Sequence, residues 1–296
     1  MGMQLSFLQQ TESCWHIQLH PETSCSRISL DPSALAMWKS LLREAREANI
    51  RILTLSGTEQ AFCHGMDLAS VLRGSIVASS EFASSLESDV GIEREDVGIA
   101  KSYAEILFAL LSAPFAVLSL VEGDVFAGGL GFLAASDWVI ASEQARFGLP
   151  EASLGLTPAM VLVALEFRMS AQNMRWLSLT SSSISAEQAI SVGLIDQIVP
   201  QGSSLHKAAR PWMRSLLRAH PQSILQIKRQ TLHRSPQDLW QAFAQAAVQT
   251  QVAINDPDVR AAIRATEQGE GVSWHQRLTK FVAQPTPHQP KERNNP

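Results

Sequence analysis

The chain has 296 residues, of which 45% are hydrophobic and 18% charged, and its formal net charge at pH 7 is −4. This composition excludes a disordered chain, and the negative charge argues against nucleic acid as a partner. Cys14, Cys25 and Cys63 lack the paired spacing of zinc or redox motifs, so we expect no metal, no disulfide framework and a reducing, cytoplasmic compartment. No apolar run reaches membrane-spanning length and no signal peptide is evident, so we expect no membrane association.

The first part of the chain predicts a strand, a strand, a helix and a strand, at about 4–9, 14–20, 32–48 and 51–56. The helix has a candidate N-cap at Asp31 and a proline at its first position. Its apolar residues recur at helical spacing. A helix between two extended apolar runs is typical of a crossover unit, so we expect an α/β fold whose sheet is at least partly parallel.

The middle of the chain predicts a loop, a helix and a strand. Residues 70–97 are rich in serine and acidic residues, which indicates a mobile loop with short helical pieces. A helix should follow at about 98–113 and end at Pro114, before the apolar strand PFAVLSL. Tyr103 lies in an apolar stripe of that helix, so we expect it in the core rather than in catalysis.

The second half of the chain predicts mainly helices. After the strand DWVIAS, they are expected at about 158–168, 170–180, 186–192, 203–219, 221–234 and 236–254. One side of the last is small and apolar, as a packed or a subunit-facing helix requires. We therefore divide the chain into a core at 1–200, a C-terminal helical region at 201–278 and a proline-rich tail at 279–296 that we expect to be disordered.

Two glycine-containing loops carry the chemistry that we expect. In AFCHGMDL, Gly65 lets the chain turn sharply, so that the N–H of Met66 can point into a cleft. In FAGGLGFLAASD, paired glycines lead into a helix, and the N–H of Gly128 would be free at the start of that helix. Either loop alone predicts only a tight turn. Two such donors aimed at one point would form an oxyanion hole.

The order of the motifs FCHGMDL, VEGDVFAGGLGFLAASDWVIAS, ARFGLPEASLGLTP and SSSISAEQAISVGLIDQIV resembles the crotonase superfamily, also called the enoyl-CoA hydratase/isomerase family, over residues 5–275. The resemblance implies a crotonase fold of repeated β-β-α units and a C-terminal helical trimerisation region. It also implies an acyl thioester substrate on CoA or an acyl carrier protein, with no cofactor beyond the phosphopantetheine arm. Met66 and Gly128 would supply the oxyanion-hole N–H groups, with Gly65, Asp67 and Gly129 contributing to substrate binding.

The acid–base residues depart from the family's best-known hydratases, which use two glutamates. The position of the first glutamate is Gly131 here, and the second is Glu151. Glu151 is our candidate general base or acid, because burial of a carboxylate raises its pKa toward neutrality. Its alternative role is a helix N-terminal charge. His64 could donate a proton to a leaving hydroxyl or bind a distal carboxylate, or it could be a surface loop histidine.

Further motifs, among them AGGLGF followed by SD, LIDQIV and NDPDVRAAIRATEQGEGVSW, are similar to the enoyl-CoA hydratase homologues of polyketide β-branching. That subfamily dehydrates 3-hydroxy-3-methylglutaryl-acyl carrier protein to the 3-methylglutaconyl thioester, so a lyase is our leading interpretation. A double-bond isomerase with a single glutamate is one alternative, and a non-catalytic thioester-binding protein is another. We expect a homotrimer or a dimer of trimers, with Trp274 near a subunit boundary.

Overall fold

The computed structural model describes residues 3–22, 27–67, 70, 72 and 98–276, and everything below refers to these residues. The expected mobile loop at 70–97 lies almost wholly outside them. The expected disordered tail at 279–296 lies wholly outside them. Among the described residues, no helix is both long enough and apolar enough to cross a membrane.

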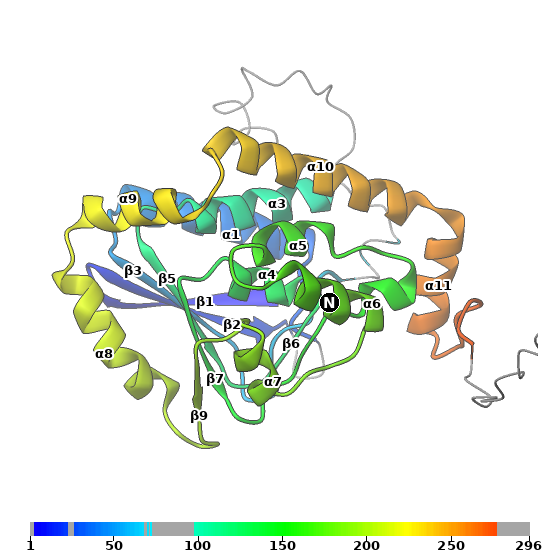
Figure 1. The fold of residues 1–296 in the computed structure, drawn as a ribbon, viewed down its shortest axis with the longest axis horizontal. Helices are drawn as coiled ribbons and strands as arrows, with labels where there is room; N and C mark the ends of the chain where they lie inside the picture. Colours follow the sequence, from blue (N-terminus) through cyan, green and yellow to red (C-terminus); the bar gives the residue numbers. More distant parts are fainter. Residues whose placement is uncertain (1–2, 23–26, 68–69, 71, 73–97, 277–296) are drawn as a thin grey trace, which may run out of the picture.

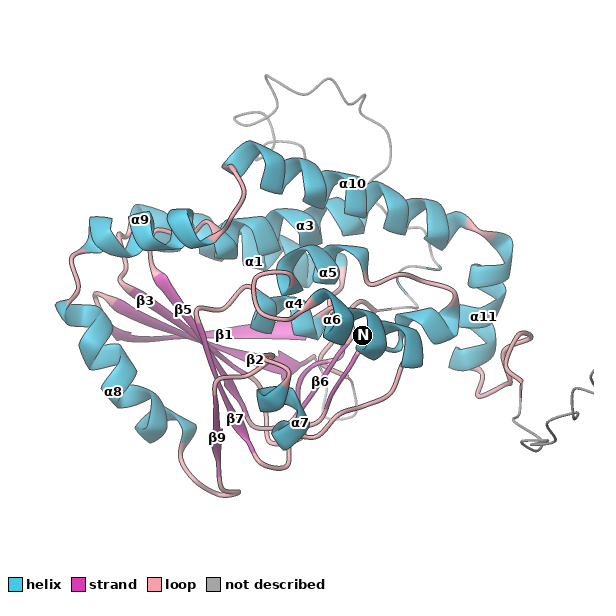
Figure 2. Cartoon of the chain, viewed as in Figure 1, coloured by secondary structure: helices cyan, strands magenta, loops and turns pink. Residues whose placement is uncertain are grey.

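The described strands form two sheets beneath a layer of helices, as Figures 1 and 2 show. The larger sheet has the order β1 (Met3–Thr11), β2 (Cys14–Pro21), β3 (Ile52–Ser56), β5 (Ala116–Val121), β7 (Trp138–Ser142) and β9 (Gln197–Val199). The smaller has the order β4 (Ala61–Cys63), β6 (Asp124–Phe126) and β8 (Phe147–Gly148). Only β1 and β2 pair antiparallel, which confirms the expected α/β class with a largely parallel sheet.

The central strands are covered on both faces, and β5 is buried along its whole length. Because side chains alternate across a strand, Val117 and Val121 enter the main core, whereas Ala116, Leu118 and Leu120 join a second cluster. Helix α8 (Leu205–Arg218) completes that second cluster with Leu205 and Ala209. A parallel strand with helices on both faces needs such a continuous apolar run.

The helices begin at recognisable caps. The side chain of Asp31 accepts a hydrogen bond from the N–H of Ala34, and this confirms the expected start of α1 (Pro32–Glu47). The remaining helices are α3 (Gly98–Leu111), α4 (Gly129–Ala134), α5 (Ala159–Leu165), α6 (Ala171–Thr180), α7 (Ala186–Ser191), α9 (Pro221–Thr231), α10 (Pro236–Asn255) and α11 (Pro257–Glu267). A 3₁₀ helix, η3, spans Pro150–Leu154.

The small apolar side of helix α10 was expected either to pack within the chain or to face another subunit. The helix packs against α3 and α5 of the same chain, and Leu239, Phe243, Ala246 and Ala247 are part of the main core. That side is therefore packed within the subunit. Any contact between subunits must use other surfaces.

Candidate active site

The two glycine loops lie against each other at the start of α4. Gly65 has φ of +83°, and a Cβ atom on it would lie 2.6 Å from Cβ of Ala127 and 2.7 Å from the nitrogen of Gly128. A Cβ atom on Gly129 would lie 2.3 Å from the carbonyl oxygen of Cys63. Side chains at either position would push the loops apart. The glycines that the sequence singles out therefore permit a backbone contact between the two candidate donors.

The N–H of Met66 points away from the neighbouring backbone segment. Met66 forms an isolated parallel bridge with Leu30, whose N–H donates to the oxygen of Gly65 at 2.7 Å. The oxygen of Leu30 accepts from Asp67 N–H at 2.9 Å. In this parallel pattern, Leu30 uses both its polar groups, whereas those of Met66 face the opposite side. The N–H of Met66 is thus directed away from residues 28–30.

Gly128 is the N-cap of α4, with φ of −54° and ψ of −17°. An N–H at the start of a helix has no acceptor within that helix. Ala127, immediately before it, has φ of +50°, a left-handed conformation that is unfavourable for a residue with a side chain. The Ala127 N–H donates to the oxygen of Gly148 at 2.9 Å, which fixes the turn. Backbone strain of this kind is concentrated at functional sites.

Glu151 stands in the first turn of η3, directly after β8. Its Oε2 atom is buried and has no hydrogen-bond partner among the described residues. Burial raises the pKa of the Glu151 carboxyl to about 7. A carboxyl group with a pKa near neutrality can both accept and return a proton at physiological pH.

Tyr103 of α3 contacts the first turn of α4. Its hydroxyl is buried and donates a hydrogen bond to the carbonyl oxygen of Gly128. Burial raises the pKa of Tyr103 well above its usual value, and the charges of Cys63 and Glu151 raise it further. The tyrosine is in the core, as expected, but its hydroxyl reaches the candidate site.

Residues 274 and 275 contact η3 from a distant part of the chain. Trp274 Nε1 and His275 Nε2 both contact the carbonyl oxygen of Ser153 in η3, at 3.2 Å and 2.9 Å. The side chain of Met66 packs against the apolar cluster that contains Ile254 of α10 and residues of α11. The backbone that carries Glu151 is therefore held by residues about 120 positions later in the chain.

Residues 17–277 match the Enoyl-CoA hydratase/isomerase family. The chain belongs to this family. Its described architecture agrees, because solved enoyl-CoA hydratases of crotonase fold superpose on nearly all of it. One is the polyketide biosynthesis enoyl-CoA hydratase of Bacillus subtilis, with a TM-score of 0.74, 24% identity and coverage of 92% of this chain and 99% of that one. An enoyl-CoA hydratase from Bacillus halodurans has a TM-score of 0.72, 18% identity and coverage of 88% and 99%.

Among characterised sequences, the bacillaene synthase dehydratase PksH of Bacillus subtilis is 28% identical over 231 residues, which are 78% of this chain and 82% of that protein. The carnitinyl-CoA dehydratase of Salmonella typhi is 26% identical over 199 residues, or 66% and 69% of the two chains. The chain is accordingly an enzyme of enoyl-CoA hydratase type, a hydratase- or dehydratase-like lyase.

His64, our second candidate, lies beside the loop but faces a different set of side chains. Its ring stacks on Phe126, with centroids 6.2 Å apart, and its Nδ1 atom is buried without a partner among the described residues. Burial and then the charge of Arg27 lower the pKa of His64, and Asp124 opposes this shift. No described contact joins His64 to Glu151, so the two candidates do not form an acid–base pair in this structure.

Asp67 and Gly129 have identifiable structural tasks in this family member. The Asp67 carboxylate accepts a hydrogen bond from Ser70 at 2.6 Å, while its N–H completes the bridge to Leu30. Gly129 permits the close approach of Cys63, as described above. Both residues shape the two glycine loops, and a direct contact of either with the substrate stays a prediction.

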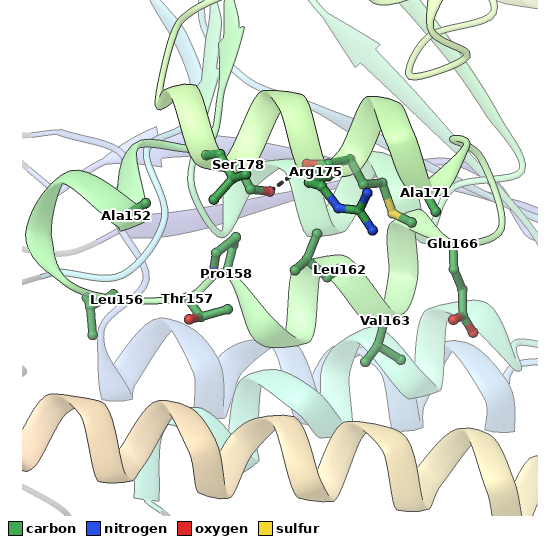
Figure 3. Close-up of a pocket in the computed structure, with 12 residues that line it drawn as sticks. Ala152, Leu156, Thr157, Pro158, Leu162, Val163, Glu166, Ala171, Arg175 and Ser178 are labelled. Atoms are coloured by element: carbon green, nitrogen blue, oxygen red, sulfur yellow. Dashed lines mark hydrogen bonds between the residues drawn. The ribbon is translucent and has the colours of Figure 1, made fainter. Parts of the chain in front are cut away.

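A pocket of about 500 Å³ borders the site without containing it. Figure 3 shows it between α5 and α6, next to the end of η3, where Ala152, Leu156 and Pro158 contribute to its wall. Glu151, Met66 and Gly128 do not line it. Most of its lining is apolar, and its one acidic residue, Glu166, is paired with Arg234. The pocket is therefore separate from the candidate residues Glu151, Met66 and Gly128, whose role stays a prediction.

Proposed function

We propose that this enzyme dehydrates a β-hydroxyacyl thioester, specifically 3-hydroxy-3-methylglutaryl-acyl carrier protein, to the 3-methylglutaconyl thioester. The observation that supports acid–base chemistry is the buried Glu151 carboxyl, with Oε2 unpartnered among the described residues, in a site whose other hydratase carboxylate position is Gly131. The similarity to two named dehydratases supports elimination of water as the reaction. The choice of acyl group rests on the motifs shared with polyketide β-branching enzymes and on the similarity to PksH.

The first step would be removal of a proton from C2 of the substrate by the ionised Glu151. The electron pair of the C2–H bond then moves toward the thioester carbonyl and gives an enolate whose charge lies on oxygen. The N–H groups of Met66 and Gly128 would donate to that oxygen. One such donor is typically worth about 10²–10³ in rate, because it acts on charge that develops in the transition state.

The second step would be loss of the C3 hydroxyl. The enolate electrons form the C2=C3 double bond while the C3–O bond breaks, and protonated Glu151 returns its proton to the departing hydroxyl as water. The carboxylate is regenerated, and the balance needs no metal or redox cofactor. A single carboxyl with a pKa of about 7 is suited to both proton transfers.

A single carboxyl also serves double-bond isomerisation, which is the second candidate. An isomerase would take a proton from one carbon of an unsaturated thioester and return it to another through the same enolate. The presence of Glu151 alone favours neither reaction. The similarity to two named dehydratases favours elimination of water.

The decisive experiment is intact-mass analysis of an acyl carrier protein loaded with 3-hydroxy-3-methylglutarate and incubated with the enzyme. We expect the loss of one water, and no loss with Glu151→Gln. The CoA thioester of the same acid, tested in parallel, distinguishes the two carriers. An unchanged mass on both carriers, together with a moved double bond in an unsaturated thioester, would establish the isomerase instead.

A further inference from the structure

We propose that Tyr103 is a positioning residue of the oxyanion hole, whose hydroxyl occupies the space left by the missing side chain of Gly131 and holds the Gly128 backbone. This inference rests on the proposed function, because it concerns the donor that Gly128 supplies to the thioester. It assigns a task to the only tyrosine of the chain.

The contact between Tyr103 and the first turn of α4 is direct. The hydroxyl donates to the carbonyl oxygen of Gly128, which also accepts from the N–H of Gly131 at 3.1 Å. Tyr103 is 1% exposed, and its ring packs edge-on against Phe132, with centroids 6.1 Å apart and an interplanar angle of 70°. The phenol therefore approaches Gly128 from a fixed direction.

The Tyr103 hydroxyl leaves no room for a side chain at position 131. A Cβ atom on Gly131 would lie 2.0 Å from the Tyr103 hydroxyl oxygen and 3.0 Å from Cδ1 of Leu107. Real Cβ atoms do not approach other atoms that closely. The place of the first hydratase glutamate is thus filled by a neutral hydroxyl group, and a carboxylate at 131 is sterically incompatible with this tyrosine.

The bond restrains a part of the backbone that has little restraint of its own. Gly128 and Gly129 lack side chains, so their φ and ψ angles are free to vary unless other groups hold them. The direction of the Gly128 N–H depends on those angles. A donor that anchors the Gly128 carbonyl keeps the residue helical and keeps its N–H aimed outward. The raised pKa of Tyr103 keeps the phenol a proton donor throughout the physiological range.

The first experiment separates positioning from general packing. Tyr103→Phe keeps the ring and removes the hydroxyl. We expect kcat to fall at least about tenfold while KM changes little. This decrease is smaller than the one that follows the removal of an oxyanion-hole donor itself. The carbonyl infrared band of bound ¹³C-labelled 3-methylcrotonyl-CoA should shift less in this variant than in the wild type, because the carbonyl is less polarised. Leu107→Val is the matched control. It alters packing beside Gly131 without removing a hydrogen bond, and it should keep the full carbonyl shift.

The second experiment tests the steric claim without any turnover. Gly131→Ala should lower the melting temperature of the wild type by several degrees. In the Tyr103→Phe background the same change should cost clearly less, since the 2.0 Å contact with the hydroxyl is gone. Additive effects of the two substitutions would overturn the claim that the phenol fills the place of a side chain at 131.

The infrared measurement also keeps this inference distinct from the proposed function. If the wild type leaves the carbonyl band unshifted, the oxyanion hole itself is wrong. If the wild type and Tyr103→Phe shift the band equally, only the positioning role of Tyr103 is wrong. A reduced shift with unchanged thioester affinity supports the inference even if the enzyme proves to be an isomerase.

Discussion

Gly65 and Gly128 touch through their backbones, so that a methyl group on Gly65 would lie 2.7 Å from the nitrogen of Gly128. We predict that Gly65→Ala reduces turnover by about 10² or more, because the methyl group displaces a donor. Gly269→Ala is the matched control. Gly269 also has a positive φ, +73°, but nothing lies within 4 Å of a Cβ atom there. Equal activity losses in the two variants would show that backbone strain alone is responsible.

Replacement of Glu151 by glutamine should abolish turnover and spare binding. The amide has nearly the same shape but cannot take up a proton, so kcat should fall by about 10²–10⁴ while the Kd for the thioester changes little. Steady-state kinetics and calorimetry measure the two quantities. Glu267→Gln, an exposed change on α11, serves as the control and should be silent. Turnover above about a tenth of wild type would make Glu151 a structural residue.

The activity should follow the ionisation of Glu151. Because burial raises its pKa to about 7, kcat/KM should be high above pH 7 and fall about tenfold per unit below it as the base becomes protonated. A pH–rate profile between about pH 5 and 9 tests this. A profile that stays flat down to pH 5 would mean that another group accepts the proton.

The same shift makes a prediction for stability. The folded-state pKa of Glu151 is raised from 4.5 to about 7, so its protonated form stabilises the fold below pH 4.5, and this contribution is lost as pH rises through 7. Glu151→Gln removes that dependence. The quantity to compare is the free energy of unfolding of the variant minus that of the wild type. This difference should be larger at pH 8 than at pH 4, by on the order of 3 kcal/mol. Urea unfolding at both pH values measures this.

The titration of His16 also changes the stability over the pH range of that experiment. Burial, and then the charge of His206, lower the pKa of His16 from 6.5 to about 4, so its contribution to stability is present above 6.5 and lost as pH falls toward 4. This change has the opposite sign. It is common to wild type and Glu151→Gln, so it cancels in the difference between them.

The bonds from Trp274 and His275 to Ser153 should matter for catalysis through Glu151. We predict that Trp274→Phe lowers kcat several-fold with little change in KM, because η3 loses one of its two anchors at that oxygen. Trp212→Phe is a closely matched control. Trp212 of α8 is 39% exposed, against 38% for Trp274, and its indole N–H donates one hydrogen bond of 3.3 Å to Oε1 of Gln197 in β9. Equal kinetic effects would exclude a specific role for the C-terminal segment.

The oligomeric state is a prediction that light scattering can test. We expect a homotrimer or a dimer of trimers in which exposed apolar side chains of α6 and α10 become covered, with Leu179 and Val252 the most exposed, at 73% and 67%. Leu179→Arg combined with Val252→Arg should release monomers. Leu217→Arg, on α8 at the other end of the molecule in Figure 1, should not. A monomeric wild type at micromolar concentration would refute the prediction.

Local patterns were enough to locate much of the secondary structure. Asp31 caps α1 as predicted. Helix α11 was missed, although Asp256 and Pro257 form the same kind of start as Asp31 and Pro32. Strands β4, β6, β8 and β9 were also missed, because runs of two or three residues are too short to show a period.

The two glycine loops and Glu151 could be predicted as site candidates from the amino-acid sequence, because each is a short motif whose chemistry depends on residue type. The sequence could not determine their contacts. That the Tyr103 hydroxyl fills the space beside Gly131, and that residues near 274 anchor the backbone after Glu151, depends on how distant segments pack. A helix stripe reports which residues are buried, but only the tertiary structure decides which buried polar atom meets which carbonyl, since those distances follow from the packing of separate elements.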